Sequence, residues 1–342
     1  MKNKLPVIID TDMGIDDALA MLVALKSDKL DIKLITTVSG NVKIEQVNKN
    51  ILYMCEKYSN DIPIASGASK PLFKKPVYAD DVHGKNGFGN FEYEEPKKKI
   101  DYDDAVEGIR EVLESTKEKI TLITLGPLTN IAKFIEKYPN LLNKIEKAYC
   151  MIGSYTGVGN ITEYAEFNAF VDPDSIIPVV ESGMDIIFSP MELGWETALK
   201  KEIFLDREIK TFEDNMIAKM IEGSHETYGE NLFCIHDLST ILGVISPELF
   251  DFPRCDAIYS KPDEETFGKL YFPLNENGKF RVQKCKDVEV VKQSHLKNIY
   301  GGWCEKDCSC WKYKYRFCVY SKALAKTKWN NKRWNLWNLF WW

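Results

Sequence analysis

Four aspartates lie within eight residues in the segment DTDMGIDD. Asp10 and Asp12 precede Gly14, and Asp16 and Asp17 follow it. Like charges this close repel one another, and a hard cation such as Ca²⁺, which takes about 6–8 oxygen ligands, offsets that repulsion. Aspartates at the start of a helix are also ordinary, because they cap free N–H groups and complement the helix dipole. That explanation covers Asp16 and Asp17 but not Asp10 and Asp12, so the segment predicts a metal or sugar site.

The elements around this segment predict an α/β fold. The apolar run 5–9 before it is typical of a buried strand, and the apolar positions of 18–25 after it follow helical spacing. Strand-like runs and helical patterns then alternate along the chain, which indicates βαβ units and an open, mostly parallel sheet flanked by helices. The remaining strand-like runs are 32–38, 120–125, 148–152 and 185–188, and the remaining helical patterns are 45–58, 131–137 and 173–181.

Five further polar segments accompany the acidic one. In open α/β sheets ligands bind at the carboxyl ends of strands, and the segments SGN, ending at Asn41, and LGPLTN, at 125–130, both follow predicted strands. A Gly-rich segment, HGKNGFGN, starts at His83 and is expected to form a mobile loop. Taken singly, each segment is weak evidence for a site. The other two are EFNAFVDP, with Glu166, Asn168 and Asp172, and IHDLST, with His236 and Asp237.

Taken together, the segments resemble those of the inosine-uridine preferring nucleoside hydrolases, a family of nucleoside N-ribohydrolases. The family's DTDxGxDDA motif is matched from Asp10 to Ala18, and its LGPLTN segment is matched without a break at 125–130. Its GN, AEFN…DP and late His-Asp segments are also present in the family's order. The resemblance implies a nucleoside hydrolase domain over residues 1–302 and the hydrolysis of ribonucleosides to ribose and free base.

The resemblance also implies a calcium ion at the bottom of the pocket. Its protein ligands would be Asp12, Asp17, Asp237 and the backbone carbonyl of Leu125, and an all-oxygen set suits Ca²⁺. A water bound to the ion would be the nucleophile, because a metal lowers the pKa of its water, and Asp12 is the implied base. Asp10 matches the motif but is expected to hold the loop.

The sugar is expected to be surrounded by carboxylates and amides. Cleavage of an N-glycosidic bond passes through an oxocarbenium-like ribosyl cation, which carboxylates stabilise. Carboxylates also accept hydrogen bonds from ribose hydroxyls, and this ties binding energy to the reacting ring. The ribose contacts implied by the resemblance are Asp16, Asn41, Asn160, Glu166 and Asn168.

Histidines are implied at the leaving base. His236 is the implied general acid, since His titrates near neutral pH, and His83 would lie near the base from the Gly-rich loop. The family's purine-preferring branch stacks the base on Trp, so His83 at that loop position points to the inosine-uridine or pyrimidine-preferring branch. His225 and Tyr228 are candidates to line the base pocket, although an exposed helix end explains them equally well. The preferred base stays open.

Composition limits the partners and the compartment. The chain has 342 residues and a net charge of −6, and this acidic balance argues against nucleic acid as the main partner. It has no apolar stretch of about 18 residues, so no membrane span is expected. The first apolar run breaks at Asp10, too early for a signal peptide, and nine scattered cysteines predict reduced thiols in a cytoplasm. Family members are commonly dimers or tetramers, so a homo-oligomer is expected by resemblance.

Residues 303–342 form an irregular, basic tail rich in Trp and Cys. The tail holds every tryptophan except Trp195. The stretch 287–291 resembles the start of the family's usual ending, and that pattern is lost after Ser294. A zinc site at CxxxCxC fits no common spacing, while Trp with Lys and Arg would suit a membrane surface. We favour a divergent ending without a selected function.

Two other functions are consistent with part of the sequence. A haloacid dehalogenase-type phosphatase also begins with a strand followed by DxD, but it needs Thr or Val where Gly14 stands, and it leaves the EFN and IHD segments unexplained. A catalytically inactive nucleoside- or ribose-binding protein would keep the sugar contacts without turnover. Release of free base, release of phosphate, or binding without turnover distinguishes the three.

Deletion of residues 303–342 tests the tail. Every matched segment lies before residue 250, so the truncated protein should hydrolyse nucleosides at close to the parental rate per folded molecule. The measurement is turnover normalised to the folded fraction seen by circular dichroism. Loss of turnover in a truncated but well-folded protein would give the tail a role in catalysis.

Overall fold

The computed structural model describes residues 4–58, 61–225, 231–261 and 265–300. Tyr228 and the whole tail 303–342 lie outside these residues, so the expectations for them stay predictions. None of the described helices is both long enough and apolar enough to cross a membrane.

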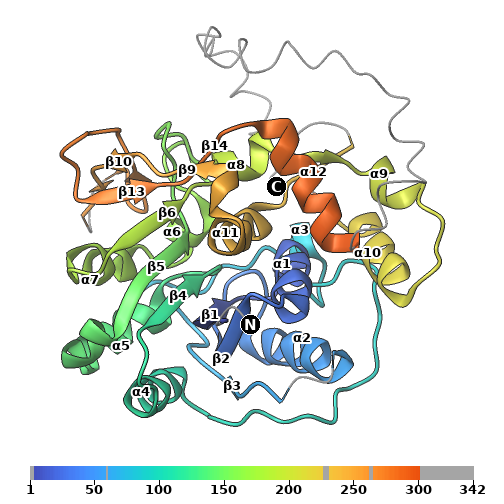
Figure 1. Ribbon diagram of the computed structural model, residues 1–342, viewed down its shortest axis with the longest axis horizontal. Coiled ribbons are helices and arrows are strands. Elements are labelled where there is room, and N and C mark those ends of the chain that lie inside the picture. The colour runs from blue at the N-terminus through green and yellow to red at the C-terminus, as the bar shows by residue number, and fades with distance from the viewer. Residues whose placement is uncertain (1–3, 59–60, 226–230, 262–264, 301–342) are drawn as a thin grey trace, which may run out of the picture. The chain divides into compact units, whose positions relative to one another are not determined.

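An eight-stranded sheet forms the centre of the fold (Figure 1). Neighbouring strands run parallel except at one edge, where β10 is antiparallel to β13. The open, mostly parallel sheet expected from the sequence is confirmed. In order across the sheet, the strands are β10 (Arg254–Cys255), β13 (Phe280–Val282), β6 (Ile186–Ser189), β5 (Ile145–Met151), β4 (Ile120–Thr124), β1 (Leu5–Thr11), β2 (Leu30–Thr37) and β3 (Ile64–Ala65).

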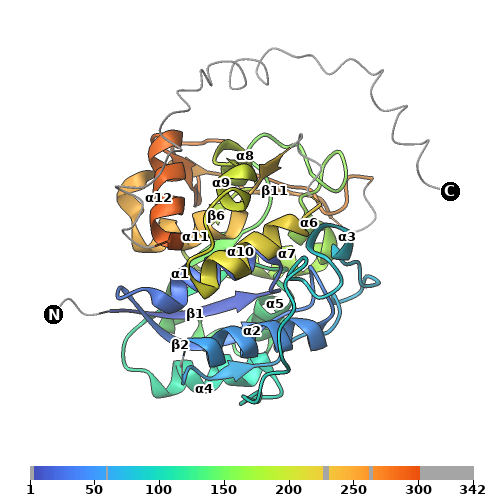
Figure 2. The ribbon, with the colours of Figure 1, turned by 90° about the vertical axis from the view of Figure 1, so that its right-hand side faces the viewer.

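Helices cover both faces of the sheet (Figures 1 and 2). In β1, Val7 and Ile9 belong to the core on one face, and Ile8 belongs to the core on the other. Because both faces are covered, the strand reads as an uninterrupted apolar run. The first core includes α1 (Ile15–Lys26), α2 (Ile44–Lys57), α10 (Phe212–Glu222), α11 (His236–Ile245) and α12 (Val288–Tyr300); the second includes α4 (Ala105–Ser115), α5 (Thr129–Lys137) and α7 (Ile176–Glu181).

The remaining described elements are short. They are the helices α3 (Asp80–His83), α6 (Phe167–Val171), α8 (Glu192–Glu196) and α9 (Glu202–Leu205), the 3₁₀ turns Pro139–Lys144, Pro173–Ser175 and Pro247–Leu249, and the strand pairs β7 (Leu199–Lys200) with β8 (Leu232–Phe233), β9 (Phe250–Asp251) with β14 (Lys284–Cys285), and β11 (Ile258–Tyr259) with β12 (Leu270–Tyr271).

The C-terminal part of the domain differs from the sequence prediction. The pattern expected to end after Ser294 continues as α12 to Tyr300. Val291, His295 and Ile299 are its buried positions, spaced four apart along one face. A histidine at the central position interrupts the apolar pattern, which is why the helix was missed. Strands β10 and β13 were missed because two or three residues are too few to show an alternation.

The carboxyl ends of the central strands meet at one edge of the sheet. Asp10 of β1 pairs in register with Thr36 of β2 and with Thr124 of β4. The polar segments that follow these three strands therefore lie close together, as expected for a parallel sheet. Helix α11 packs against α1 and β5 and brings the His-Asp segment to the same edge.

Candidate active site

The acidic loop, residues 10–17, makes a tight turn between β1 and α1. Met13 has a φ of 40°, in the left-handed region that non-glycine residues seldom adopt. Asp17 closes the turn, because one carboxylate oxygen accepts from Thr11 Oγ1 at 2.6 Å and the other accepts from the Gly14 N–H at 2.9 Å. The loop thus folds back onto the first turn of α1, with the Asp17 side chain fully buried.

Asn41, in the SGN segment, joins two of the aspartates. Its backbone N–H donates to Asp12 Oδ2 at 2.8 Å, and its side-chain amide donates to Asp17 Oδ2 at 2.9 Å. Gly40 permits this approach, because a Cβ atom there would lie 2.1 Å from Asp12 Oδ2. Asn41, predicted to contact the ribose, therefore also holds the carboxylates that are predicted to bind the metal.

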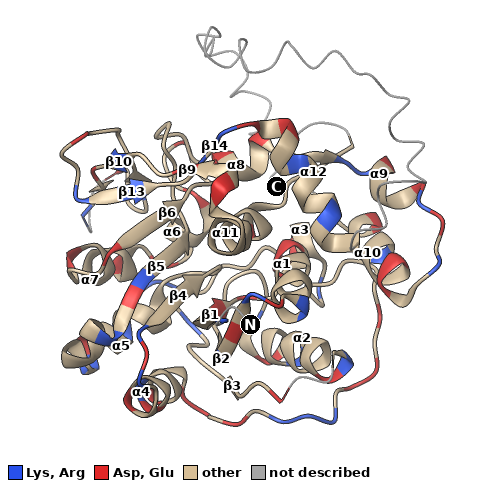
Figure 3. Cartoon of the chain, viewed as in Figure 1, with Lys and Arg blue, Asp and Glu red and all other residues tan. Residues whose placement is uncertain are grey.

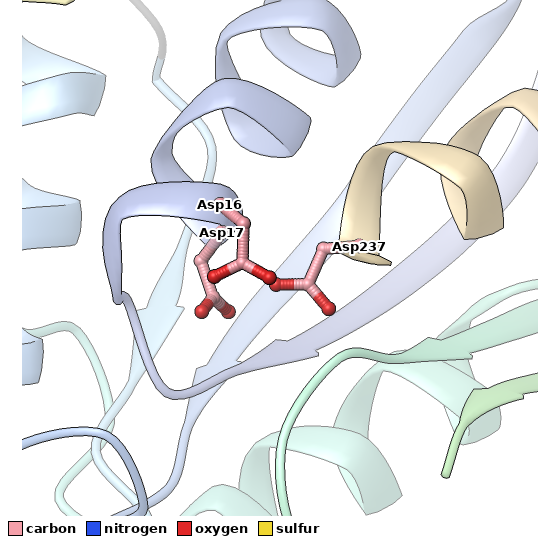
Figure 4. A group of neighbouring side chains, drawn as sticks. All are labelled: Asp16, Asp17 and Asp237. Carbon is pink, nitrogen blue, oxygen red and sulfur yellow. The ribbon is translucent and has the colours of Figure 1, made fainter. Parts of the chain in front are cut away.

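Three carboxylates converge at the site (Figure 4). Asp16 and Asp17 come from the first turn of α1, and Asp237 comes from the first turn of α11. One oxygen of each lies within 4.8 Å of the others, and all three residues are buried. Asp17 and Asp237 are two of the predicted metal ligands, so the structure brings them together. It adds Asp16, which is predicted to contact the ribose.

Asp12 interacts electrostatically with these three carboxylates. Burial, and then the charge of Asp17, raises the pKa of Asp12 well above its usual value. Burial, together with the charges of Asp16 and Asp17, does the same to the pKa of Asp237. Asp12 Oδ1 is buried and has no hydrogen-bond partner among the described residues. Crowded carboxylates with an unpartnered oxygen suit a hard divalent cation, so the residues present fit such an ion.

The backbone carbonyl of Leu125, the remaining predicted metal ligand, lies at the end of β4. It accepts a hydrogen bond from Asn168 Nδ2 at 2.8 Å, and the same amide donates to the Met151 carbonyl at 3.0 Å. Asn168 therefore bridges the carboxyl ends of β4 and β5. A carbonyl oxygen has two lone pairs, so this hydrogen bond leaves Leu125 able to bind an ion as well.

Glu166 is the N-cap of α6. Its carboxylate accepts from the backbone N–H groups of Asn168 at 2.9 Å, Gly153 at 3.0 Å and Ala169 at 3.2 Å. Burial outweighs these hydrogen bonds and raises the pKa of Glu166 to about 7. Asn160, in the preceding loop, has a buried Oδ1 without a hydrogen-bond partner among the described residues. The two predicted ribose residues are thus a rigidly held carboxyl and an amide oxygen still able to accept.

His236 is the first residue of α11, next to Asp237. Burial lowers its pKa to about 4, so the imidazole is neutral at pH 7. Its ring packs on Gly194 of α8, where a Cβ atom would lie 2.1 Å from His236 Nδ1. A neutral imidazole can donate a hydrogen bond from one ring nitrogen but carries no charge to repel a nearby cation.

His83 ends α3 and is buried. Its Nδ1 accepts from the backbone N–H of Ile15 at 3.1 Å, at the start of α1. Burial lowers the pKa of His83 to about 4, so this ring is also neutral. His225 is exposed, and its backbone N–H donates to the Val82 carbonyl at 3.1 Å, which links it to α3, the helix that His83 ends. The contacts of both residues with a base stay predictions.

Two supporting residues, Asn130 and Glu192, had no assigned role in the sequence prediction. Asp10, expected to be a structural residue that holds the acidic loop, joins β1 to β2 and to α5, because it accepts from Thr36 Oγ1 and from Asn130 Nδ2 at 2.7 Å. Asn130 lies in the LGPLTN segment, so the motif itself was the signal. Glu192 accepts from Ser154 Oγ at 2.6 Å in the loop leading to Asn160. No local pattern marks Glu192, because its partners come from a distant part of the chain.

Buried side chains from the C-terminal part of the domain also contact helix α11. Gln283 Nε2 donates to the Ser239 carbonyl at 2.8 Å, and Ser239 Oγ lies 3.2 Å from His295 Nε2 of α12. All three residues are fully buried. Gly243 makes room for Gln283, since a Cβ atom there would lie 2.5 Å from Gln283 Oε1. These contacts fix the helix whose first turn supplies His236.

Comparison with known proteins identifies the family. The family model described as inosine-uridine preferring nucleoside hydrolase matches residues 7–299. The chain belongs to this family. It is accordingly a nucleoside N-ribohydrolase, and the phosphatase alternative is set aside.

Individual relatives agree with that assignment. The chain is 35% identical over 301 residues to the non-specific ribonucleoside hydrolase RihC of Salmonella paratyphi C. The aligned region covers 86% of this chain and 97% of that relative. Among solved structures, a plant nucleoside hydrolase, the PpNRh1 enzyme, superimposes on this chain with a TM-score of 0.79 at 26% identity. The superposition covers 87% of this chain and 100% of the plant enzyme. A purine-preferring ribonucleoside hydrolase from Gardnerella vaginalis shares the fold, with a TM-score of 0.79 at 24% identity over 86% of this chain and 98% of its own.

Proposed function

We propose that this nucleoside hydrolase cleaves the N-glycosidic bond of ribonucleosides with a Ca²⁺ ion held by its buried aspartates. The observation that carries the proposal is the convergence of Asp16, Asp17 and Asp237, with one oxygen of each within 4.8 Å of the others. The proposed ligands are Asp17 and Asp237 together with Asp12 and the Leu125 carbonyl, and Asp16 lies beside them as a proposed ribose contact. Calcium is preferred to a transition metal because every donor is an oxygen and the described cluster contains neither His nor Cys.

Asp12 is proposed as the general base. When bound, the ion would lower the pKa of a water molecule in the site. Asp12 Oδ1 then takes the proton of the attacking water, since this oxygen of Asp12 is buried and has no donor among the described residues. Asn41 holds the other oxygen, Oδ2, at 2.8 Å and so keeps Oδ1 directed away from the backbone of the SGN segment.

The ribose is proposed to bind between the acidic loop and α6. Asp16, Asn41, Asn160, Glu166 and Asn168 are the proposed contacts. Carboxylates beside the sugar stabilise the positive charge that develops on the ring in the transition state. Glu166 is well suited to this role, because three backbone N–H groups fix its orientation before the substrate arrives.

His236 and His83 are proposed to serve the leaving base. His236 is neutral at pH 7, so it polarises the departing base by donating a hydrogen bond, and full protonation of the base would require the imidazolium form of His236. A neutral imidazole also avoids repelling the ribosyl cation. His83 in place of Trp, together with the similarity to a relative named a non-specific ribonucleoside hydrolase, favours a broad range of nucleosides that includes inosine and uridine.

The cysteines indicate the setting of the reaction. Cys55, Cys150, Cys255 and Cys285 are free thiols, which supports a reducing compartment such as the cytoplasm. Release of free bases from nucleosides suits purine and pyrimidine salvage. We propose residues 1–302 as the catalytic domain, 303–342 as a dispensable tail, and a dimer or tetramer as the assembly.

Removal of the ion tests the proposed cofactor. Reducing-sugar release from inosine, uridine, cytidine and adenosine should be abolished by a calcium chelator and restored by added Ca²⁺. Phosphate release from phosphorylated substrates should stay at background. Full turnover in excess chelator would contradict the calcium proposal, and nucleoside binding without any base release would favour the inactive binding protein.

Asp12→Asn tests the proposed base. The substitution keeps the size and one oxygen ligand but removes the charge, so turnover at saturating Ca²⁺ should fall on the order of 10²–10⁴-fold. Calorimetric affinity for ribose should change much less, because Glu166 and Asn168 remain. Turnover within about threefold of the parent, far short of the general-base range, would move the role to Asp10 or Asp16.

His236→Ala tests activation of the leaving group. Hydrolysis of inosine should slow far more than hydrolysis of a nitrophenyl riboside, whose leaving group departs unaided. Gly194→Ala should produce the same selective loss, because its new methyl group would displace the His236 ring. Equal losses on both substrates, or a loss explained by a lower melting temperature alone, would contradict the acid role.

A further inference from the structure

Asn50 is a fully buried side chain that contacts two loops of the site from behind. It lies on α2, and its amide nitrogen donates to the Met13 carbonyl at 3.0 Å and to the Asn86 carbonyl at 2.8 Å. Met13 belongs to the acidic loop. Asn86 belongs to the Gly-rich segment 83–90, which begins with His83 and is called the His83 loop. One side chain thus joins the loop of the aspartates to the loop of the histidine.

The hydrogen-bonding capacity of Asn50 is completely used. Its Oδ1 accepts from Gln46 Nε2 at 2.9 Å and from the Tyr93 hydroxyl, while its two N–H groups serve the two carbonyls. An amide has two donors and two acceptor lone pairs, so all four are satisfied. The orientation of the amide is determined as well, because both loop partners are carbonyls and can only accept.

The backbone around Asn50 is shaped to receive it. Gly87 has a φ of 74°, and a Cβ atom there would lie 2.8 Å from Asn50 Nδ2 and 2.9 Å from the Met13 carbonyl. Met13 is held at a φ of 40°, a strained conformation that persists only when its surroundings enforce it. The Asn50 hydrogen bond to the Met13 carbonyl is one of the contacts that enforce it.

We propose that Asn50 is a positioning residue that holds the acidic loop in its metal-binding conformation and couples it to the His83 loop. Met13 lies between Asp12 and Gly14, so its backbone angles decide where Asp12 points relative to Asp17. The His83 loop meets the same segment, since His83 accepts from the Ile15 N–H. Without Asn50, both loops lose their common partner and the carboxylates lose their fixed spacing. This inference rests on the proposed metal site.

Asn50→Asp provides the sharpest test. It keeps the size and an acceptor for Tyr93 and Gln46, but it places an oxygen instead of an N–H against the two carbonyls. Calorimetric Ca²⁺ affinity should fall by about 10–100-fold, the range for residues that orient metal ligands. Asn50→Ala should weaken Ca²⁺ binding in the same direction without the added repulsion, and Tyr93→Phe, which leaves both donations intact, should bind Ca²⁺ nearly as the parent does.

Asn48→Ala is the matched control. Asn48 lies on the same helix and makes a comparable pair of hydrogen bonds, with Thr37 Oγ1 at 2.6 Å and Ser66 Oγ at 2.8 Å, but neither partner is in the acidic or His83 loop. The Asn48→Ala variant should have a lower melting temperature than the parent, while its Ca²⁺ affinity and turnover should stay near parental values. A purely structural role for Asn50 would make its variants behave in the same way, and that result would overturn the proposal.

The two levels of inference can fail separately. If the parent enzyme gives no calorimetric signal with Ca²⁺, the proposed cofactor is wrong, and nucleoside turnover of the same samples decides the role of Asn50. A residue that positions the site must lower kcat in Asn50→Asp and Asn50→Ala well beyond any loss in Asn48→Ala. If the parent binds Ca²⁺ and the Asn50 variants bind it equally well, the positioning role is wrong and the cofactor proposal stands.

Discussion

Asp12, Asp16, Asp17 and Asp237 bring like charges into the protein interior, where a lower dielectric makes their mutual repulsion much stronger than it is in water. On the outer helices acidic and basic residues occur together, as on α10 and α12 (Figure 3). There Lys219 lies 2.7 Å from Glu222, and Lys292 lies 3.3 Å from Glu289. Asp17 instead accepts hydrogen bonds from a hydroxyl, a backbone N–H and an amide. The negative charge is thus oriented without being cancelled, which leaves it available to a cation.

Neutral donors recur throughout the site for the same reason. The amides of Asn41, Asn168 and Asn130 each donate to a carboxylate or to the backbone carbonyl at a strand end. An Asn amide offers two N–H groups in one plane, so a single side chain can join two strands or two loops. A Lys or Arg in these places would neutralise the carboxylates and would compete with the proposed ion.

The two histidines of the site follow a related logic. His236 begins α11, and His83 accepts from the first turn of α1, so both rings lie at helix N-termini. The positive end of a helix dipole and burial both disfavour the imidazolium form. A site that stabilises a ribosyl cation is better served by neutral rings, which can donate a hydrogen bond to the base without adding positive charge.

The sequence determined the fold class, the family and the polar segments. Both faces of the central sheet are covered, so the strands read as apolar runs, and the acidic loop between β1 and α1 could be located from the order and spacing of its residues. These features are formed by residues that are neighbours in the chain, so they can be recognised from the sequence alone. The resemblance to the family assigned Asp17, Asp237 and Leu125 to one site before any contact was known.

Only the tertiary structure decided which side chains meet. Asp16 joins Asp17 and Asp237 because α11 packs on α1, and Glu192 and Asn50 act on loops far from them in the sequence. His295 is buried against Ser239, so α12 extends to Tyr300 where the pattern suggested an end. Contacts between distant segments depend on how the helices pack on the sheet, and no spacing along the chain records that geometry.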